Sequence, residues 1–123
     1  MYEICRERVF SASHQLREYS GRCERLHGHN WRVRVHLAAD ELDPAGMVID
    51  FHELDRLLAA VLDPYEHVHL NDVPPFDRIN PSSENLARYL FERLGAAIND
   101  GGVRVSRVSV WESDTSCASY FES

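Results

Sequence analysis

The chain has 123 residues, and its 44 % content of hydrophobic residues is ordinary for a globular protein and argues against disorder. The formal net charge of −7 argues against a nucleic-acid or anionic-membrane partner, because repulsion would oppose association. The longest apolar run, residues 57–62, is far too short to cross a bilayer, and no signal-peptide pattern opens the chain. We therefore expect a cytoplasmic protein without a membrane partner, folded as one domain over residues 1–123.

All thirteen basic residues are arginine, which excludes a Schiff-base lysine and a Walker-type phosphate lysine. Bond cleavage by this chain would therefore need a metal or an acid–base pair. Seven of the arginines fall within residues 1–36, which hold only four acidic residues. Such local positive charge is typical either of a solvated strand face or of a mouth for a small anionic substrate. Three scattered cysteines, an odd number, predict no disulfide framework.

Two strands are predicted in the first third of the chain. Residues 2–14 are rich in β-branched and aromatic side chains and end on His14. Residues 27–38 alternate between apolar and polar side chains, which predicts a half-buried strand with His27, His29 and Trp31 on one face. A polar connection punctuated by Gly21 lies between them.

The rest of the chain predicts two helices followed by two strands. Apolar residues recur at helical spacing over residues 51–62 and again over residues 86–98, after the candidate N-caps Ser82 and Ser83. Residues 103–113 predict a strand whose apolar parity changes, which indicates a bulge near Ser106–Arg107. A last short strand is expected over residues 118–123. This order predicts an α+β fold with an antiparallel sheet.

The first two predicted strands carry a candidate metal site. Side chains alternate across a strand, so His27 and His29 project from one face, about 7 Å apart. His14 can supply a third ligand if the two strands pair as a hairpin. Three neutral histidines with one open position are typical of catalytic zinc, whereas two polar strand residues beside a turn glycine, Gly28, are the plain alternative.

Cys23, four residues before His27, allows two interpretations. As a fourth ligand it would close a structural zinc site. As a thiolate beside an open site it would be a base, because nearby cations lower a thiol pKa from its ordinary value of about 8.5. The spacing does not choose between them.

Two further sets of residues suggest proton transfer and ligand binding. Glu66 precedes His67, and an acid beside an imidazole can orient it for a proton relay, although an exposed loop histidine would look the same. Glu112 ends an apolar strand, where its carboxylate either faces solvent or accepts two N–H bonds from a flat heterocycle.

Six blocks of the sequence, in order, resemble the family of 6-pyruvoyl-tetrahydropterin and 6-carboxy-tetrahydropterin synthases. They are "FSASH", "CERLHGHNW", "GMVIDFHEL", "EHVHLND", "NPSSENLARYL" and "VWESDTSCASY". The resemblance spans nearly the whole chain. It implies a tunnelling fold (T-fold), with a four-stranded antiparallel sheet and two helices on one face. It also implies trimers that close into a barrel, stacking of two trimers into a hexamer, and active sites at subunit interfaces.

By this resemblance each candidate residue acquires an expected role. His14, His27 and His29 become the zinc ligands and Cys23 the proton-abstracting base. His67 with its acidic neighbour becomes the second acid–base group, and Glu112 becomes the pterin anchor, sometimes described as part of a relay with His67. The substrate of the family is 7,8-dihydroneopterin triphosphate.

The Cys-x3-His-Gly-His spacing is similar to that of the bacterial 6-carboxy enzymes of the queuosine (7-deazapurine) pathway, whereas animal-type 6-pyruvoyl enzymes usually have a longer gap. This favours the carboxy reaction, which releases acetaldehyde and triphosphate. The alternatives are the 6-pyruvoyl reaction and a non-catalytic zinc- or pterin-binding homologue. One departure from the family is Glu66, where Asp is usual, because the extra methylene moves the carboxylate by about 1 Å.

Overall fold

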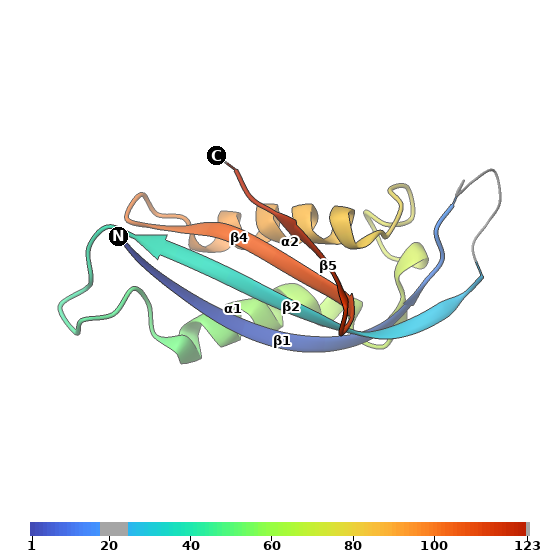
Figure 1. The fold of residues 1–123 in the computed structure, drawn as a ribbon, viewed down its shortest axis with the longest axis horizontal. Helices are drawn as coiled ribbons and strands as arrows, with labels where there is room; N and C mark the ends of the chain where they lie inside the picture. Colours follow the sequence, from blue (N-terminus) through green and yellow to red (C-terminus); the bar gives the residue numbers. More distant parts are fainter. Residues whose placement is uncertain (18–24, 123) are drawn as a thin grey trace.

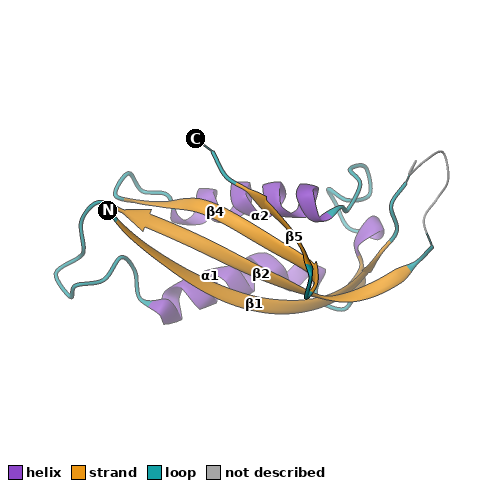
Figure 2. Ribbon diagram, viewed as in Figure 1, coloured by secondary structure: helices purple, strands orange, loops and turns teal. Residues whose placement is uncertain are grey.

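The computed structural model describes residues 1–17 and 25–122. Two helices lie against one long, curved antiparallel sheet (Figures 1 and 2). In chain order the elements are β1 (Tyr2–His14), β2 (His27–Ala39), α1 (Phe51–Leu62), a 3-10 turn (Asp63–Tyr65), β3 (Val68–His69), a second 3-10 turn (Leu70–Asp72), α2 (Ser83–Ile98), β4 (Val103–Ser113) and β5 (Ser116–Tyr120). Neither helix in the described part of the chain combines the length and apolarity needed to cross a membrane.

The sheet has the order β3-β1-β2-β4-β5. The expected four antiparallel strands are present as β1, β2, β4 and β5, and the first three begin and end within a residue of their predicted bounds. The prediction of four strands in all misses β3, a two-residue strand that pairs with β1 in parallel. A segment so short carries no alternation from which to predict it. The last strand also lies two residues earlier than expected, because Ser116 pairs with Ser113 directly after a tight turn.

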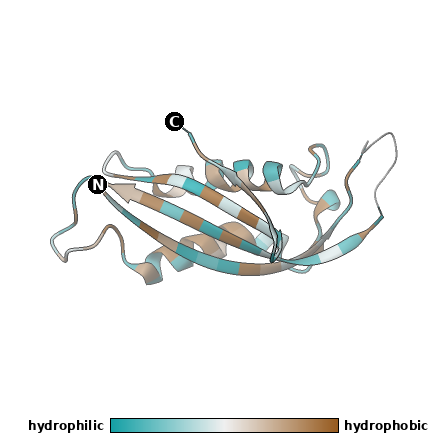
Figure 3. Ribbon diagram, viewed as in Figure 1, coloured by the Kyte–Doolittle hydropathy of each residue, from teal (hydrophilic) through white to brown (hydrophobic). Residues whose placement is uncertain are grey.

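One face of the sheet is covered by both helices, and we call it the inner face. Alternate residues of β2 point there, and Val33, Val35 and Leu37 are fully buried against the helices. Figure 3 shows the corresponding alternation of apolar and polar residues along the strands. The opposite side, the outer face, carries no helix and presents mainly polar and charged side chains from the same strands.

The amphipathic helices begin at side-chain caps. Asp50 accepts a hydrogen bond from the backbone N–H of His52 at 2.7 Å, and Ser82 Oγ accepts one from Asn85 N–H at 3.1 Å. These bonds satisfy N–H groups that the first turn leaves without partners. Ser82, rather than Ser83, is therefore the cap of α2, and this fixes the chain at Pro81, directly before the helix.

Two irregularities in strand pairing position the functional residues. The register of β2 with β4 shifts because Leu37 pairs with Val105 and His36 pairs with Arg107, which leaves Ser106 as the extra residue of the predicted bulge. At its other end, pairing of β2 with β4 stops at Arg32 and Trp111. Residues 27–31 of β2 therefore continue with β1 alone, as a two-stranded ribbon.

Candidate metal and catalytic site

Four side chains converge on the inner face where the ribbon leaves the sheet. One ligand atom from each of His14, His27, His29 and Glu112 lies within 4.8 Å of the others. Glu112 Oε1 is 3.1 Å from His14 Nε2, 3.6 Å from His27 Nε2 and 3.0 Å from His29 Nε2. Three imidazole nitrogens and one carboxylate oxygen at this spacing form a donor set suited to a divalent transition metal.

Strand register explains why these residues meet. His14 and His27 are the last paired residues of the β1–β2 hairpin, so the hairpin on which the third ligand depended is confirmed. His29 lies two residues further on the same face. Glu112 follows Trp111, the last β4 residue paired with β2, and so its side chain reaches the inner face beside the ribbon. Its proximity to the histidines is a product of this topology that sequence spacing alone did not give.

Backbone carbonyls fix how two of the histidines present their ring nitrogens. His14 Nδ1 lies 2.8 Å from the carbonyl oxygen of Pro81, and His27 Nδ1 lies 2.8 Å from that of Arg25. A carbonyl can only accept, so both Nδ1 atoms carry the proton, and in the neutral rings both Nε2 atoms present lone pairs. Those two Nε2 atoms are 2.8 Å apart. Two lone pairs so placed repel each other unless a cation or a proton lies with them, and carbonyl-anchored imidazoles are typical of metal ligands.

His29 gives a second test of metal fit. Its Nε2 is buried, and its close polar neighbour among the described residues is Glu112 Oε1 at 3.0 Å, a contact of ion-pair type. Burial lowers the pKa of His29 below its ordinary value of 6.5, Glu112 acts in the opposite direction, and the neighbouring histidines lower it further. The neutral imidazole favoured in this way is the form that binds a metal.

The cluster has a rigid floor and an open side. His14 is only 1 % exposed and packs edge-on against Trp31, with ring centroids 4.8 Å apart. Trp31 is fully buried and donates its indole N–H to the carbonyl of Ala12 at 3.2 Å. The side chains of His27 and Glu112 remain about one-third exposed. A ligand can therefore approach from solvent while the histidines are held in place from behind. Cys23 lies outside the described residues.

Glu66 and His67 lie at the β3 edge of the sheet. Glu66 Oε1 accepts a hydrogen bond from Ser11 N–H at 3.0 Å, and His67 N–H donates to the carbonyl of Ser11 at 2.6 Å. His67 Nε2 is 3.3 Å from Glu66 Oε1, so the longer acid does reach the imidazole, whose side chain is 79 % exposed. His67 has a φ of 57°, a left-handed conformation that is uncommon outside glycine.

Glu66 and His67, the relay pair, make no direct contact with the metal cluster within one chain, although His67 and His29 line the same open cavity. Val68 pairs with Ala12, and Ala12 pairs with His29, so β3 is two strands away from His29. At the usual strand spacing this is about 10 Å between backbones. No contact joins His67 to the four cluster residues within the described parts of the chain.

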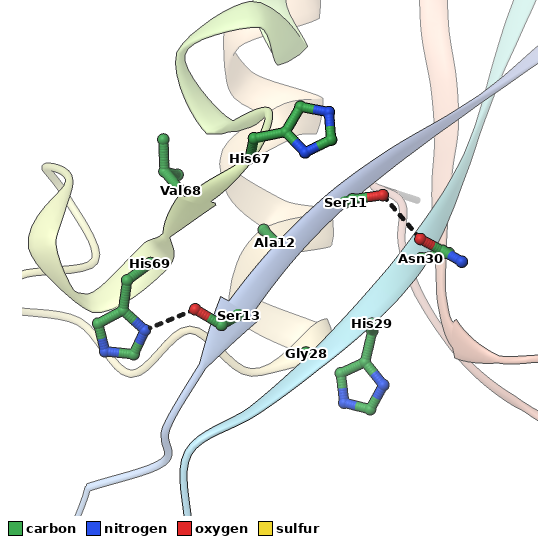
Figure 4. Close-up of a pocket in the computed structure, with 9 residues that line it drawn as sticks. All are labelled: Ser11, Ala12, Ser13, Gly28, His29, Asn30, His67, Val68 and His69. Carbon is green, nitrogen blue, oxygen red and sulfur yellow. Dashed lines mark hydrogen bonds between the residues drawn. The ribbon is translucent and has the colours of Figure 1, made fainter.

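An open cavity of about 550 Å³ lies between the β3 loop and the β1–β2 ribbon (Figure 4). Ser13 Oγ is 2.9 Å from His69 Nδ1, and Ser11 Oγ donates to Asn30 Oδ1 at 2.7 Å. The described residues that line the cavity are Ser11, Ala12, Ser13, Gly28, His29, Asn30, His67, Val68 and His69. The hydroxyl, amide and His69 groups were not predicted as site residues. The sequence indicates only that Ser11, Ser13 and Asn30 share one face of their strands, and many solvent-exposed residues show the same alternation.

Four of the arginines of residues 1–36 lie along the strands, with Arg6 and Arg8 on the inner face and Arg32 and Arg34 on the outer face. Arg6 and Arg8 contact Asp55 of α1 at 3.3 Å and 3.0 Å, and hydrogen bonds from these two arginines, Arg8 first, lower the pKa of Asp55. Arg34 pairs with Glu7 across the outer face. The structure therefore distributes this positive charge over both faces of the sheet.

Comparisons with known proteins agree with this geometry. The family model described as 6-pyruvoyl tetrahydropterin synthase matches residues 3–123. A 6-carboxy-5,6,7,8-tetrahydropterin synthase of Synechocystis is 39 % identical, with 98 % of this chain and 94 % of that protein covered. The human 6-pyruvoyl tetrahydrobiopterin synthase is 33 % identical, covering 96 % and 90 %.

The structural comparison adds the fold. The structure of Caenorhabditis elegans 6-pyruvoyl tetrahydropterin synthase superposes with a TM-score of 0.82 at 32 % identity, covering 100 % of this chain and 98 % of that one. The α+β T-fold expected from the sequence is thus confirmed, with β3 as an addition to the expected sheet. The chain belongs to the 6-pyruvoyl tetrahydropterin synthase family.

Proposed function

We propose that this chain is a zinc-dependent 6-carboxy-5,6,7,8-tetrahydropterin synthase, a lyase acting on 7,8-dihydroneopterin triphosphate in the cytoplasm. Its product would be a precursor of queuosine and other 7-deazapurines. The main observation behind the proposal is that His14, His27, His29 and Glu112 converge on the inner face of the sheet, where a ligand can reach them from solvent. The 39 % identity to a relative with this name supports the choice of reaction.

The three histidines would hold the zinc ion through their Nε2 atoms. Zinc bound there supplies a Lewis acid that acidifies the side-chain hydroxyls of the substrate. The carbonyls of Pro81 and Arg25 keep His14 and His27 in the tautomer that binds metal, because each accepts a hydrogen bond from an Nδ1–H group. Trp31 prevents His14 from turning away.

Three further residues would bind the pterin and transfer protons. The Cys23 thiolate removes a proton from the substrate side chain. Glu112 binds the pterin ring by accepting two N–H bonds, and its position beside the histidines brings that ring next to the metal ligands. His67 carries protons, with Glu66 to orient and charge-stabilise it. The 3.3 Å approach of Glu66 to His67 supports this role despite the extra methylene.

The separation of His67 from the cluster supports an active site shared between chains. His67 is exposed at the sheet edge, two strands from His29. In a homo-oligomer, a trimer or a hexamer of two trimers, His67 of one copy would serve the cluster and Cys23 of its neighbour. Mixing Cys23→Ala and His67→Ala chains tests this, because mixed oligomers regain activity only if the two residues act from different chains. Mixtures as inactive as either parent would contradict a shared site.

The reaction itself is tested by mass spectrometry of the product made from 7,8-dihydroneopterin triphosphate. The proposal expects 6-carboxy-tetrahydropterin together with acetaldehyde and triphosphate. A product that retains the side-chain carbons, without acetaldehyde, would identify the 6-pyruvoyl reaction instead. Zinc-loaded protein that leaves the substrate unchanged would identify a non-catalytic homologue.

A further inference from the structure

The outer face of the sheet carries an arrangement of arginine and tryptophan that none of the proposed steps uses. Arg32 and Arg34 are alternate residues of β2, so both point to this face. Their guanidinium carbons lie 4.3 Å and 4.8 Å from the ring centroid of Trp111 on β4. We call these three residues the arginine strip. Stacking on an indole orients a guanidinium group and leaves its N–H edges available for hydrogen bonds.

The two arginines differ in how their charges are compensated. Arg34 donates to Glu7 across the β1–β2 pair, with Nε 2.6 Å from Oε1. Arg32 makes no ion pair with a carboxylate in the described part of the chain, and its Nε is buried without a hydrogen-bond partner there. Arg32 is opposite Val9 on one neighbouring strand and Trp111 on the other, so the register places no acid directly beside it. Because this Nε is out of reach of solvent, an anion would contact the terminal Nη groups of Arg32, whose side chain is only partly buried.

From this geometry we propose that the arginine strip binds a free oligophosphate anion. Guanidinium groups bind phosphate oxygens through paired N–H bonds. Alternate residues of a strand are about 7 Å apart, which suits an anion with several linked phosphates better than a single phosphate. Ser109, opposite Arg34 in the register, is buried and hydrogen-bonded to Ser119 at 2.7 Å, so the anion would be held by the arginines and not by this hydroxyl. The net charge of −7 means that an anion bound there would be held by the strip and not by overall attraction.

The strip is separate from the metal cluster. Trp111 and Glu112 are consecutive residues, and one lies with the outer-face arginines while the other lies with the inner-face histidines. A phosphate chain on Arg32 is therefore separated from the histidines of the same chain by the sheet. The inference thus goes beyond the proposed reaction and does not depend on turnover.

The test is titration of the whole protein with inorganic triphosphate, followed by calorimetry and tryptophan fluorescence. We expect saturable binding with a change in Trp111 emission, and weaker binding of orthophosphate. Arg32→Ala and Arg34→Ala should each weaken triphosphate binding about tenfold, as expected for loss of hydrogen bonds to a charged group. Glu7→Gln should strengthen it, because Arg34 loses its competing carboxylate. Arg88→Ala is the matched control, since Arg88 pairs with Glu92 on the exposed side of α2, and should leave the affinity unchanged.

A zinc ion would itself attract triphosphate, so the metal cluster must be separated from the strip. Protein treated with a chelator, and the His14→Ala variant, should bind triphosphate as the untreated protein does. Loss of binding in both would place the anion at the histidines and overturn the proposal. Unchanged affinity in both arginine variants would overturn it too. ATP tests the source of the phosphate chain, since tighter binding of ATP than of triphosphate would contradict a site for free oligophosphate.

Discussion

The two faces of the sheet are built from the same strands but suit ligands of opposite charge. On the inner face, histidine lone pairs and the Glu112 carboxylate converge, an arrangement that suits a cation. On the outer face, Arg32 and Arg34 present N–H donors around Trp111, an arrangement that suits an anion. Because side chains alternate along a strand, one residue step separates the two sets. A sheet with helices on one side can therefore keep two incompatible sites apart by its own thickness.

The largest expected effect is on the inner face, from His14→Ala. This change removes a metal ligand and leaves the buried carbonyl of Pro81 without its donor, so zinc binding should be lost and stability should fall by about 2 kcal/mol. Metal analysis and thermal unfolding measure the two effects. His36→Ala is the control, because His36 lies on the outer face near Glu3 and should keep its zinc. Stoichiometric zinc in the His14 variant would contradict the assignment of the cation site to the inner face.

The next effect separates metal binding from proton transfer. His67→Ala should lower turnover by roughly 10²- to 10⁴-fold, the range for loss of a general acid–base group. Its zinc content should be unchanged, since His67 lies two strands from His29. The neighbouring His69→Ala, which loses only a bond to Ser13, serves as the control with near-normal turnover. Zinc loss in the His67 variant would mean that the β3 edge of the sheet, where His67 lies, contributes to metal binding on the inner face.

Removal of the proposed zinc ion should have a smaller effect on the fold. The core is formed by the helices and the middle of the sheet, whereas the histidines lie where the ribbon leaves it. Circular dichroism after chelation should therefore show an intact fold, with a melting temperature lowered by loss of bound metal. Unfolding at room temperature would instead favour a closed structural site in which Cys23 is the fourth ligand.

The smallest effect is expected from Gly28→Ala, between the two ligand histidines of β2. A Cβ atom at Gly28 would meet its nearest neighbour, the carbonyl oxygen of Ala12, at 3.9 Å, which is ordinary contact. Stability should rise by about 0.5 kcal/mol, because alanine restricts the unfolded chain. Thermal unfolding checks this, and zinc content should not change. A clear loss of stability would show that Gly28 is needed for close packing on this strand.

The sequence predicted the elements well where apolar residues recur at a regular spacing, and poorly where contacts between distant segments define the structure. Alternation over residues 27–38 was enough to give β2 and the shared face of His27 and His29. The change of parity near Ser106 gave the bulge. By contrast, β3 has two residues, and it is defined by its pairing with Ala12 and Ser13 of β1, next to the docking of Glu66 and His67 on Ser11. The association of Glu112 with the histidines depends on where two strands part, which no local pattern encodes.

The bulge on β4 has a consequence for the chemistry of both faces. Ser106 is the extra residue, and its Oγ donates to the carbonyl of His36 at 3.2 Å, which ties the bulge to β2. Every later residue of β4 points to the side opposite the one that a regular strand would give it. If β4 paired regularly with its present sequence, without a bulge at Ser106, Glu112 would face the arginines and Trp111 the histidines. The bulge at Ser106 therefore assigns the carboxylate to the cation site and the indole to the anion site.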